Sequence, residues 1–280
     1  MFKIIINNRL LIFGISLLFI VFFAAIFAPF LTTYDPIEIS IANSLLGMSW
    51  DHPFGTDEMG RDVLTRVLFG AKISLWVGAV ATFYSGIFGV LFGLLSGYYQ
   101  TFDSIFSRLV DGLMVFPGLI MAILLMAALG PSTNNVIIAM IILYTPRIVR
   151  VVRSSVIQIK IEDFVDAARV IGANDLRILF IHILPNAFAP LIVQVAFGFA
   201  WAILVESGMS FLGLGLPAPT PSWGNIISDG RNFVYSAPWI MLFPGLAICM
   251  SVMGLNFIGD GLRDFLDPHL RNVVSRESWV

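Results

Sequence analysis

The chain has 280 residues, of which 58% are hydrophobic and 12% charged, and its mean hydropathy is +0.90. Soluble domains carry about 25% charged residues, so a water-soluble fold of this length would lack the ionised groups to cover its surface. The net charge of −2 excludes the basic surface of a nucleic-acid-binding protein. The single cysteine, Cys249, excludes an internal disulfide and a cysteine-rich metal site. Composition therefore predicts an integral membrane protein with no nucleic-acid partner.

The first membrane span is predicted close to the N-terminus. Lys3 and Arg9 precede an uncharged apolar run, Leu10–Leu31. A secretory signal has an apolar core of about 7–15 residues and a small-residue cleavage site, and this run is longer and has no such site. We therefore expect it to remain in the protein as a spanning helix.

Five further stretches approach the roughly 20 apolar residues that a span requires. They are Ile73–Gly97, Leu109–Leu129, Val136–Tyr144 continuing to Val152, Ala187–Val205 and Ile240–Gly259. The fourth span is the weakest because Pro146, Arg147 and Arg150 fall in its second half. We expect that half to lie at the membrane interface, with the arginines reaching outward. The pattern predicts an all-α membrane protein with six transmembrane helices.

Six spans place both termini on the same side of the membrane. If that side is the cytoplasm, the four basic residues outside are Arg61, Arg66, Lys72 and Arg231. The other twelve are inside: Lys3, Arg9, Arg108, Arg147, Arg150, Arg153, Lys160, Arg169, Arg177, Arg263, Arg271 and Arg276. Cytoplasmic loops carry an excess of Lys and Arg, so the distribution predicts an N-in, C-in orientation.

The chain is predicted to be organised around one membrane domain. Residues 1–72 form the first span and an external segment, residues 73–270 form the membrane domain, and residues 271–280 form a cytoplasmic tail. The membrane domain contains a long cytoplasmic loop at residues 156–186. No internal repeat or low-complexity tract divides the chain further.

The cytoplasmic loop shows apolar residues at helical spacing with charged residues between them. Gly172 stands where a helix would end in a left-handed residue, and Asn174 or Asp175 is placed to cap a second helix that stops before Pro185. The pattern predicts two short helices joined by a tight bend. Periodicity alone also fits an amphipathic hairpin lying on the membrane surface.

Several residues of this loop resemble the EAA loop of ABC importer permeases. They are Asp166, Ala167, Ala168, Gly172, Ala173, Leu184 and Pro185. The resemblance implies that the loop is the coupling helix that docks on the ATP-binding subunit, and the small side chains of Ala167, Ala168 and Gly172 suit a close approach. Asp166 departs from the usual Glu, and His182 stands where Ile is common.

Four other motifs resemble the C-type permeases of dipeptide, oligopeptide and nickel importers. They are HPFGTDEMGRD at 52–62, SFLGLG at 210–215 with PTPSWG at 219–224, GDGLRD at 259–264 and LDP at 266–268. The resemblance covers residues 36–270 and implies a type I ABC importer permease in the bacterial inner (plasma) membrane. It also implies a heterodimer with a homologous second permease, two cytoplasmic ATP-binding subunits and a periplasmic or lipid-anchored solute-binding protein.

The external motifs also have a physical interpretation of their own. Thr56 or Asp57 is placed to cap a helix leading to the second span, and Arg61 lies within reach of Asp57 and Asp62. We predict an external structural or gating motif composed of Gly55, Thr56, Asp57, Gly60, Arg61, Asp62, Trp223 and Gly224. A solvated charged turn, and an interfacial anchor at Trp223, are the simpler alternatives.

The sequence lacks the motifs of an enzyme. No G-x-x-x-x-G-K-[ST] loop is present, so the energy for transport is expected to come from another polypeptide. His52, His182 and His269 are spread over both predicted sides, which argues against a metal site and a catalytic triad. We predict no catalytic residue, no metal site and no cofactor.

A secondary transporter or channel remains a distant alternative, and a non-transporting scaffold another. Ion-coupled carriers keep ionisable residues inside their spans, whereas Asp111, Glu206 and Asp260 are predicted near span ends. Among importers, nickel or another metal complex competes with peptides as the solute. Few imidazole or thiolate ligands lie along the predicted spans, so peptides are favoured.

Overall fold

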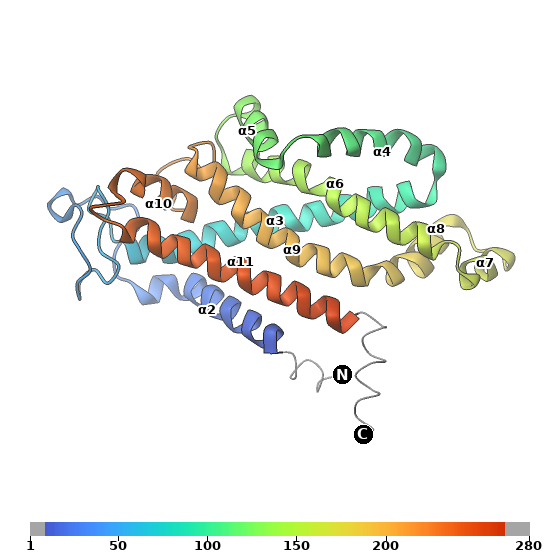
Figure 1. Ribbon diagram of the computed structural model, residues 1–280, viewed down its shortest axis with the longest axis horizontal. Coiled ribbons are helices and arrows are strands. Elements are labelled where there is room, and N and C mark those ends of the chain that lie inside the picture. Colours follow the sequence, from blue (N-terminus) through green and yellow to red (C-terminus); the bar gives the residue numbers. More distant parts are fainter. Residues whose placement is uncertain (1–8, 267–280) are drawn as a thin grey trace, which may run out of the picture.

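The computed structural model describes residues 9–266, and within that range the protein consists of helices and contains no β-strand. The long helices lie side by side along the long axis of the molecule (Figure 1). The helices are α2 (Arg9–Leu31), α3 (Val63–Tyr98), α4 (Gln100–Val115), α5 (Gly118–Leu129), α6 (Thr133–Ile159), α7 (Asp163–Val170), α8 (Asp175–Arg177), α9 (Leu184–Phe211), α10 (Trp223–Gly230) and α11 (Trp239–Leu266). Short helical segments are η1 (Ile41–Asn43), η2 (Ile178–Ile183) and η3 (Arg231–Phe233).

Five helical stretches within residues 9–266 are long and apolar enough to cross a membrane. They are α2, α3, α6, the stretch Asp175–Phe211 that ends in α9, and α11. The prediction of an all-α membrane protein is confirmed. A sixth span requires that α4 and α5 be counted together.

The third predicted span, Leu109–Leu129, is wrong as a single helix. It is divided between α4 and α5, which are bent by 96° relative to each other. The break lies at Phe116 and Pro117, where Phe116 has extended backbone angles (φ −82°, ψ 139°). Proline disfavours the helical conformation in the residue before it, and this explains the bend.

The second span begins ahead of its predicted start. α3 runs from Val63 through residue 72 to Tyr98, and Asp62 caps it by accepting a hydrogen bond from the Thr65 N–H at 2.7 Å. The prediction that Thr56 or Asp57 caps this helix is therefore wrong. The carboxylate of Asp62 satisfies a backbone donor that has no partner within the helix.

The fourth span is longer than predicted. α6 continues through Pro146 to Ile159, so Arg147 lies near the middle of the helix. The position of these arginines at the membrane interface stays a prediction. Proline inside a spanning helix is tolerated where neighbouring helices satisfy the freed backbone groups, and Pro146 is buried here.

The second helix of the predicted cytoplasmic loop does not stop before Pro185. After α8 the chain forms a π-helical turn, η2, which leads directly into α9. The Leu184 N–H donates to the carbonyl of Leu179, five residues back. In a regular α-helix the proline ring would clash with the carbonyl four residues earlier. The wider π turn stands where that clash would arise.

Close packing of α3 on α6 forms the centre of the bundle. Gly89, Gly93 and Gly97 recur every four residues along α3 and face Ile148, Val152 and Val156 of α6. A Cβ atom at Gly93 would lie 2.6 Å from the Val152 Cβ, and one at Gly97 would lie 2.5 Å from the Val156 Cβ. Small residues at this spacing let two membrane helices approach at backbone distance.

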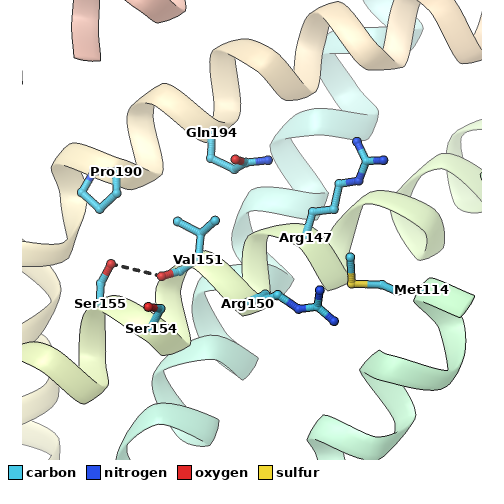
Figure 2. A pocket seen from close by; sticks show the side chains of 8 residues that line it. All are labelled: Met114, Arg147, Arg150, Val151, Ser154, Ser155, Pro190 and Gln194. Carbon is cyan, nitrogen blue, oxygen red and sulfur yellow. Dashed lines mark hydrogen bonds between the residues drawn. The ribbon is translucent and has the colours of Figure 1, made fainter. Parts of the chain in front are cut away.

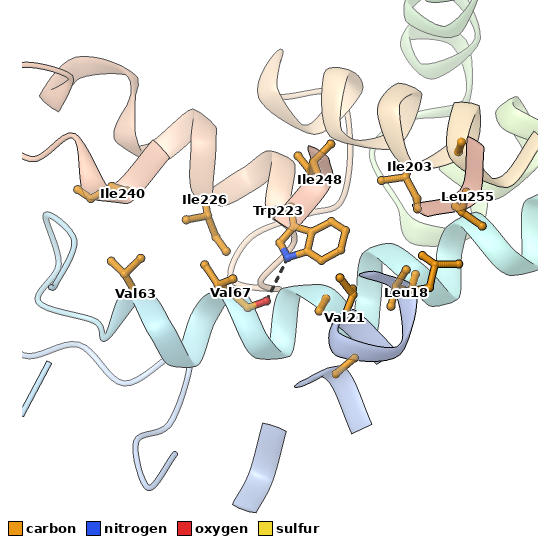
Figure 3. Packing of buried hydrophobic residues seen from close by; sticks show 14 of the residues in the cluster. Leu18, Val21, Val63, Val67, Ile203, Trp223, Ile226, Ile240, Ile248 and Leu255 are labelled. Carbon is orange, nitrogen blue, oxygen red and sulfur yellow. Dashed lines mark hydrogen bonds between the residues drawn. The ribbon is translucent and has the colours of Figure 1, made fainter. Parts of the chain in front are cut away.

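A second packing cluster surrounds Trp223. Figure 3 shows its ring between α3, α2, α9 and α11, with Val67, Val21, Ile203 and Ile248 around it. The Trp223 side chain is completely buried, and its indole N–H donates to the carbonyl of Val67 at 3.1 Å. Its burial excludes the interpretation of Trp223 as an anchor at the membrane interface.

The two ends of the molecule carry different elements (Figure 1). The loop containing α7 and α8 lies at one end, toward which α2 begins and α11 finishes. The segment between α2 and α3 lies at the opposite end together with α10. The predicted separation of the loop at 156–186 from the 52–62 motif is therefore confirmed, and we call these the loop end and the motif end.

We expect Gly93→Ala to destabilise the protein, because the new methyl group would overlap Val152. Overpacking of this kind costs about 1–3 kcal/mol. Gly112→Ala in α4 is the matched control, since a Cβ there meets no atom within 4 Å and alanine favours a helix by up to about 1 kcal/mol. Thermal unfolding in detergent measures both variants. An unfolding temperature for Gly93→Ala at or above that of Gly112→Ala would contradict the packing argument.

Candidate functional site

The loop end is shaped by a helix terminus that requires glycine. α7 ends at Val170, and Gly172 adopts a left-handed conformation with φ +86°. The Gly172 N–H donates to the carbonyl of Arg169, and the Ala173 N–H donates to that of Ala168, both at 3.0 Å. These two bonds form a Schellman motif. The predicted bend at Gly172 is confirmed, and so is the Asn174 cap, whose side chain accepts from the Arg177 N–H at 2.9 Å.

The predicted docking residues divide between surface and core. Asp166, Ala167, Gly172 and Pro185 are exposed, and Ala173 and Leu184 are half-buried. Ala168 is 4% exposed and packs with Val165, Val156, Ile178 and Leu179 inside the protein. The buried side of α7 therefore holds the loop against α6 and η2. Its other side is exposed.

An exposed apolar surface at the loop end was missed at the level of sequence. Its members are Ile161, Phe164, Val170, Ile171 and Leu176, all between 44% and 87% exposed. We call these five residues the loop-end apolar surface. Exposed apolar groups that occur together in one segment are typical of a protein interface. The sequence showed Ile161, Phe164, Ile171 and Leu176 at helical spacing, but spacing alone did not show which of the apolar residues are exposed.

The loop is tied to the junction between α3 and α4. Asp175 accepts hydrogen bonds from the hydroxyl groups of Tyr98 at 2.7 Å and Tyr99 at 3.2 Å. The Arg169 guanidinium lies 5.9 Å from the ring centroid of Tyr98, and the Lys160 ammonium donates to the carbonyl of Gly97 at 2.9 Å. These contacts come from α6, α7 and α8 and converge on the end of α3. The loop is therefore held directly against the end of a candidate spanning helix.

The ionisation of these groups suits the contacts they make. Desolvation, followed by the hydrogen bond with Asp175, raises the pKa of Tyr99 above its usual value. The hydrogen bond with Tyr98 is the main cause that raises the pKa of Arg169. Both tyrosine hydroxyl groups thus stay protonated donors at neutral pH, and Arg169 stays charged.

At the motif end, Asp57 lies at the centre of a buried ion cluster. Its side chain is completely buried, and it accepts from the Arg61 Nε at 2.7 Å and the Arg66 Nη1 at 2.6 Å. The carboxylate of Asp229, on α10, also pairs with both arginines at 3.0 Å. The cluster therefore connects the 52–62 motif with α3 and α10. The predicted pairing of Arg61 with Asp57 is confirmed, and burial contradicts the alternative of a solvated charged turn.

Asp62 and Thr56 organise the rest of the motif. Asp62 pairs with the His52 Nδ1 at 3.0 Å in addition to capping α3. The Thr56 hydroxyl donates to the carbonyl of Asn43 at 2.5 Å and accepts from the Leu46 N–H at 2.8 Å. The predicted alternative pairing of Arg61 with Asp62 is not formed, because His52 and Thr65 occupy that carboxylate.

The two motif glycines stand where no other residue fits. Gly55 and Gly60 have positive φ angles of 70° and 73°. A Cβ at Gly55 would lie 2.6 Å from the Trp239 Nε1, and one at Gly60 would overlap the carbonyl oxygen of Ser40. Left-handed backbone and close approach both favour glycine here. The motif is therefore a folded layer packed onto the ends of α3 and α11.

A buried carboxylate lies beneath α10. Glu206 of α9 is completely buried, and it accepts from the Ser210 hydroxyl at 2.8 Å and the Ser74 hydroxyl of α3 at 3.0 Å. Ser74 also accepts from the Trp223 N–H at 3.3 Å. A Cβ at Gly224 would lie 2.5 Å from the carbonyl of Ser207, so α10 packs directly on α9. The sequence placed Glu206 near a span end and did not reveal its hydroxyl partners, which come from separate helices.

The side chains of the motif end do not form a ligand set for a metal ion. Within residues 9–266, no group of three His, Cys, Asp or Glu side chains is placed to hold one. His52 is engaged with Asp62, and Cys249 is an exposed free cysteine. The ionisable groups of the motif end are committed to one another, which is typical of a structural role.

Comparison with known proteins places this geometry in a family. Residues 89–272, which include the loop end, match the family described as binding-protein-dependent transport system inner membrane component. The chain belongs to this family. With five or more candidate spans it is a multi-pass protein of the bacterial inner membrane.

Curated relatives of this inner membrane component extend over nearly the whole chain. A putative peptide transport system permease protein of Brucella suis biovar 1 is 48% identical, over 92% of this chain and 87% of the relative. The dipeptide transport system permease protein DppC of Alkalihalophilus pseudofirmus is 46% identical, over 97% and 90%. The oligopeptide transport system permease protein OppC of Bacillus subtilis is 40% identical, over 95% and 87%.

A solved structure supports the fold of this inner membrane component. The inward-facing MetNI methionine ABC transporter matches with a TM-score of 0.53, covering 69% of this chain and 94% of the other at 19% identity. The likeness shows that the helices share the arrangement of an ABC importer permease. The fold implied by the sequence motifs is thereby confirmed.

We expect Asp57→Asn to destabilise the motif end strongly, because it leaves the buried guanidinium groups of Arg61 and Arg66 with Asp229 alone. Removing one partner of a buried ion pair costs about 3–5 kcal/mol. Asp229→Asn is the matched control and should cost less, since Asp229 is 32% exposed and Asp57 remains in place. Thermal unfolding and limited proteolysis of residues 32–62 measure both. Equal losses in the two variants would contradict the central position of Asp57.

Proposed function

We propose that this protein is one permease subunit of an ATP-driven importer that takes up peptides. The single observation that carries the choice of solute is the set of relatives named as peptide, dipeptide and oligopeptide permeases, at 40–48% identity over most of both chains. Within residues 9–266 no group of three or more His, Cys, Asp or Glu side chains is placed to hold a metal ion. Nickel or another metal complex is the second candidate solute.

The assembly we propose follows from the family and from the surfaces of the chain. A homologous second permease completes the pathway, one of two ATP-binding subunits docks at the loop end, and a solute-binding protein delivers the solute at the motif end. The loop end then faces the cytoplasm, in agreement with the predicted N-in, C-in orientation. The chain itself contains no G-x-x-x-x-G-K-[ST] motif, so ATP hydrolysis belongs to the partner subunits.

The proposed coupling step acts on the loop-end apolar surface. Exposed Phe164, Val170 and Ile171 offer a hydrophobic contact, and Gly172 provides the bend that presents them. When the ATP-binding subunits close, they displace this surface, and the bonds of Asp175 to Tyr98 and Tyr99 carry the displacement to α3. The spans then move as packed bodies between two arrangements.

The motif end contributes rigidity on the other side. The Asp57 cluster joins the loop before α3 to α10, and Glu206 joins α3 to α9 through Ser74. We propose that Gly55, Thr56, Gly60, Trp223 and Gly224 form with this cluster a closed outer layer that opens as a unit. This layer is the counterpart of the gating motif expected from the sequence.

We expect Gly172→Val to abolish ATP-dependent uptake while the permease still inserts and folds. A β-branched residue cannot hold φ +86° without strain, so the Schellman bend and the docking surface would be lost. Gly130→Val is the matched control, since Gly130 has φ +82° and, like Gly172, no atom within 4 Å of the place that a Cβ would occupy. Uptake and ATPase activity of the complete importer in proteoliposomes measure both. Unchanged uptake in Gly172→Val would refute the coupling role.

The choice of solute is tested with the complete importer and its own binding protein. We expect saturable, ATP-dependent uptake of radiolabelled di- to pentapeptides, competed by unlabelled peptides and not by nickel complexes. Wild-type importer without ATP is the control. Uptake of a radiolabelled nickel complex that peptides fail to compete would replace the peptide proposal by the metal one.

A further inference from the structure

A cavity of about 510 Å³ lies between α4, α6 and α9. Binding sites for small molecules have volumes of about 300–1,000 Å³, so the cavity has the size of a short peptide segment. Figure 2 shows its lining, which comprises Met114, Arg147, Arg150, Val151, Ser154, Ser155, Pro190 and Gln194. Two guanidinium groups, two hydroxyl groups and one side-chain amide lie among the apolar groups of this lining.

Three arginines spaced three residues apart follow one face of α6. Two of them are neutralised by α4, because Arg153 pairs with Asp103 and Arg150 pairs with Asp111 at 2.8 Å. The residue numbers rise along α4 as they fall along α6, so the two helices are antiparallel here. The third arginine, Arg147, faces the next turn of α4, where Met114 lines the cavity in place of a carboxylate.

Arg147 is therefore a charged group with no counter-ion in the described part of the chain. Among residues 9–266 no carboxylate pairs with it, and its guanidinium lies over the ring of Trp201, 5.4 Å from the centroid. It lies about 20 Å from each end of α6, counting 1.5 Å per residue. Ionisable side chains within membrane spans almost always face the bundle interior or a water-filled cavity, and they mark functional sites.

A hydrogen-bond acceptor, the side-chain oxygen of Gln194, belongs to the same cavity lining as the Arg147 guanidinium. The Gln194 Nε2 donates to the Tyr144 hydroxyl at 2.7 Å, and that hydroxyl donates to the backbone carbonyl of Gln194 at 2.8 Å. The side-chain amide is thus held in one orientation, and its Oε1 has no hydrogen-bond partner among the residues described. In Figure 2 the side chains of Gln194 and Arg147 both lie at the cavity, on α9 and α6 respectively.

We propose that Arg147 binds the C-terminal carboxylate of a peptide as the peptide passes through this subunit, an inference that rests on the proposed peptide function. Guanidinium and carboxylate groups match in a bidentate geometry. Gln194 Oε1 accepts from an N–H group of the peptide backbone. Both groups belong to every peptide with a free C-terminus, so the contact does not depend on peptide side chains. Exposure of Arg147 keeps the contact weak enough for release.

The competing occupant is a carboxylate of the second permease subunit. In that case Arg147 would be a structural residue of the interface between the two permeases. The following experiments use the complete importer, so that this outcome overturns the proposal.

The first experiment compares trialanine with trialanine amide, which lacks the terminal carboxylate. Uptake is measured in proteoliposomes at equal amounts of peptide-loaded binding protein, with loading determined by equilibrium dialysis. We expect wild-type importer to take up the acid faster than the amide. Arg147→Gln should lower uptake of the acid about tenfold or more and bring the acid-to-amide ratio close to one, while Arg147→Lys retains part of the preference. Arg108→Gln, which removes another exposed arginine outside the cavity, is the control.

Three results would overturn the inference from this experiment. They are an equal fall in acid and amide uptake, an unchanged ratio in Arg147→Gln, and loss of the second permease from purified Arg147→Gln complexes. Wild-type uptake of both peptides without any acid preference also overturns it and leaves the peptide function standing. Absence of uptake of both peptides overturns the peptide function itself, and the inference with it.

The second experiment reports the electrostatic potential inside the cavity and does not depend on the binding protein. Ser154→Cys in a Cys249→Ala background places one thiol on the cavity wall. The measured quantity is the rate of reaction with the anionic reagent sulfonatoethyl methanethiosulfonate divided by the rate with its cationic trimethylammonium analogue. We expect Arg147→Gln to lower this ratio. No reaction of the thiol in the assembled importer would show that a partner subunit fills the cavity. An anion preference that persists in Arg147→Gln would also overturn the proposal.

Discussion

The contact between α3 and α6 is the constraint on which the rest of the structure depends. In a bilayer, lipid tails are as apolar as leucine, so helices are held together by close packing and by polar contacts. Gly89, Gly93 and Gly97 bring the α3 backbone against Val152 and its neighbours on α6. Once this pair is formed, α3 supplies the residues that organise both ends of the molecule. Arg66 and Ser74 reach the motif end, and Tyr98 reaches the loop end.

Charged groups inside the protein follow a consistent rule. Asp57 is buried with two arginines, and Glu206 is buried among serine hydroxyl groups. Such partners are needed because an uncompensated charge away from water costs several kcal/mol. Arg147 is exposed, but it differs from Arg150 and Arg153 on the same helix in having no paired carboxylate within the described chain, and we therefore give it a functional explanation.

The arrangement of these networks suggests how the two ends communicate. Each network joins at least two helices, and α3 takes part in both the outer cluster and the contacts of Asp175 at the loop end. Between these networks, α3 and α6 are closely packed along the glycine face of α3. A push on the loop-end apolar surface is therefore expected to rotate packed helices together, since tightly packed interfaces switch between arrangements and do not deform gradually.

Much of the fold was predictable from local patterns, whereas the errors occurred where distant segments decide the outcome. The membrane class follows from composition, and five spans follow from apolar runs whose lengths match the bilayer. The bend at Gly172, the Asn174 cap and the pairing of Arg61 with Asp57 follow from preferences that act within a few positions of the chain. Hydropathy alone overlooked the effect of Pro117 on the third span, and it ended the fourth span at Val152, before the end of α6 at Ile159. Likewise, Ala168 was predicted on a docking surface and lies in the core, and Glu206 was placed near a span end without its partner Ser74.

Interactions between residues close in sequence can be predicted from the sequence, so it was enough to predict a helical membrane protein with a bent loop and a charged motif. The pairing of the charges could be read only from the folded chain, because ion pairs join residues up to 168 positions apart.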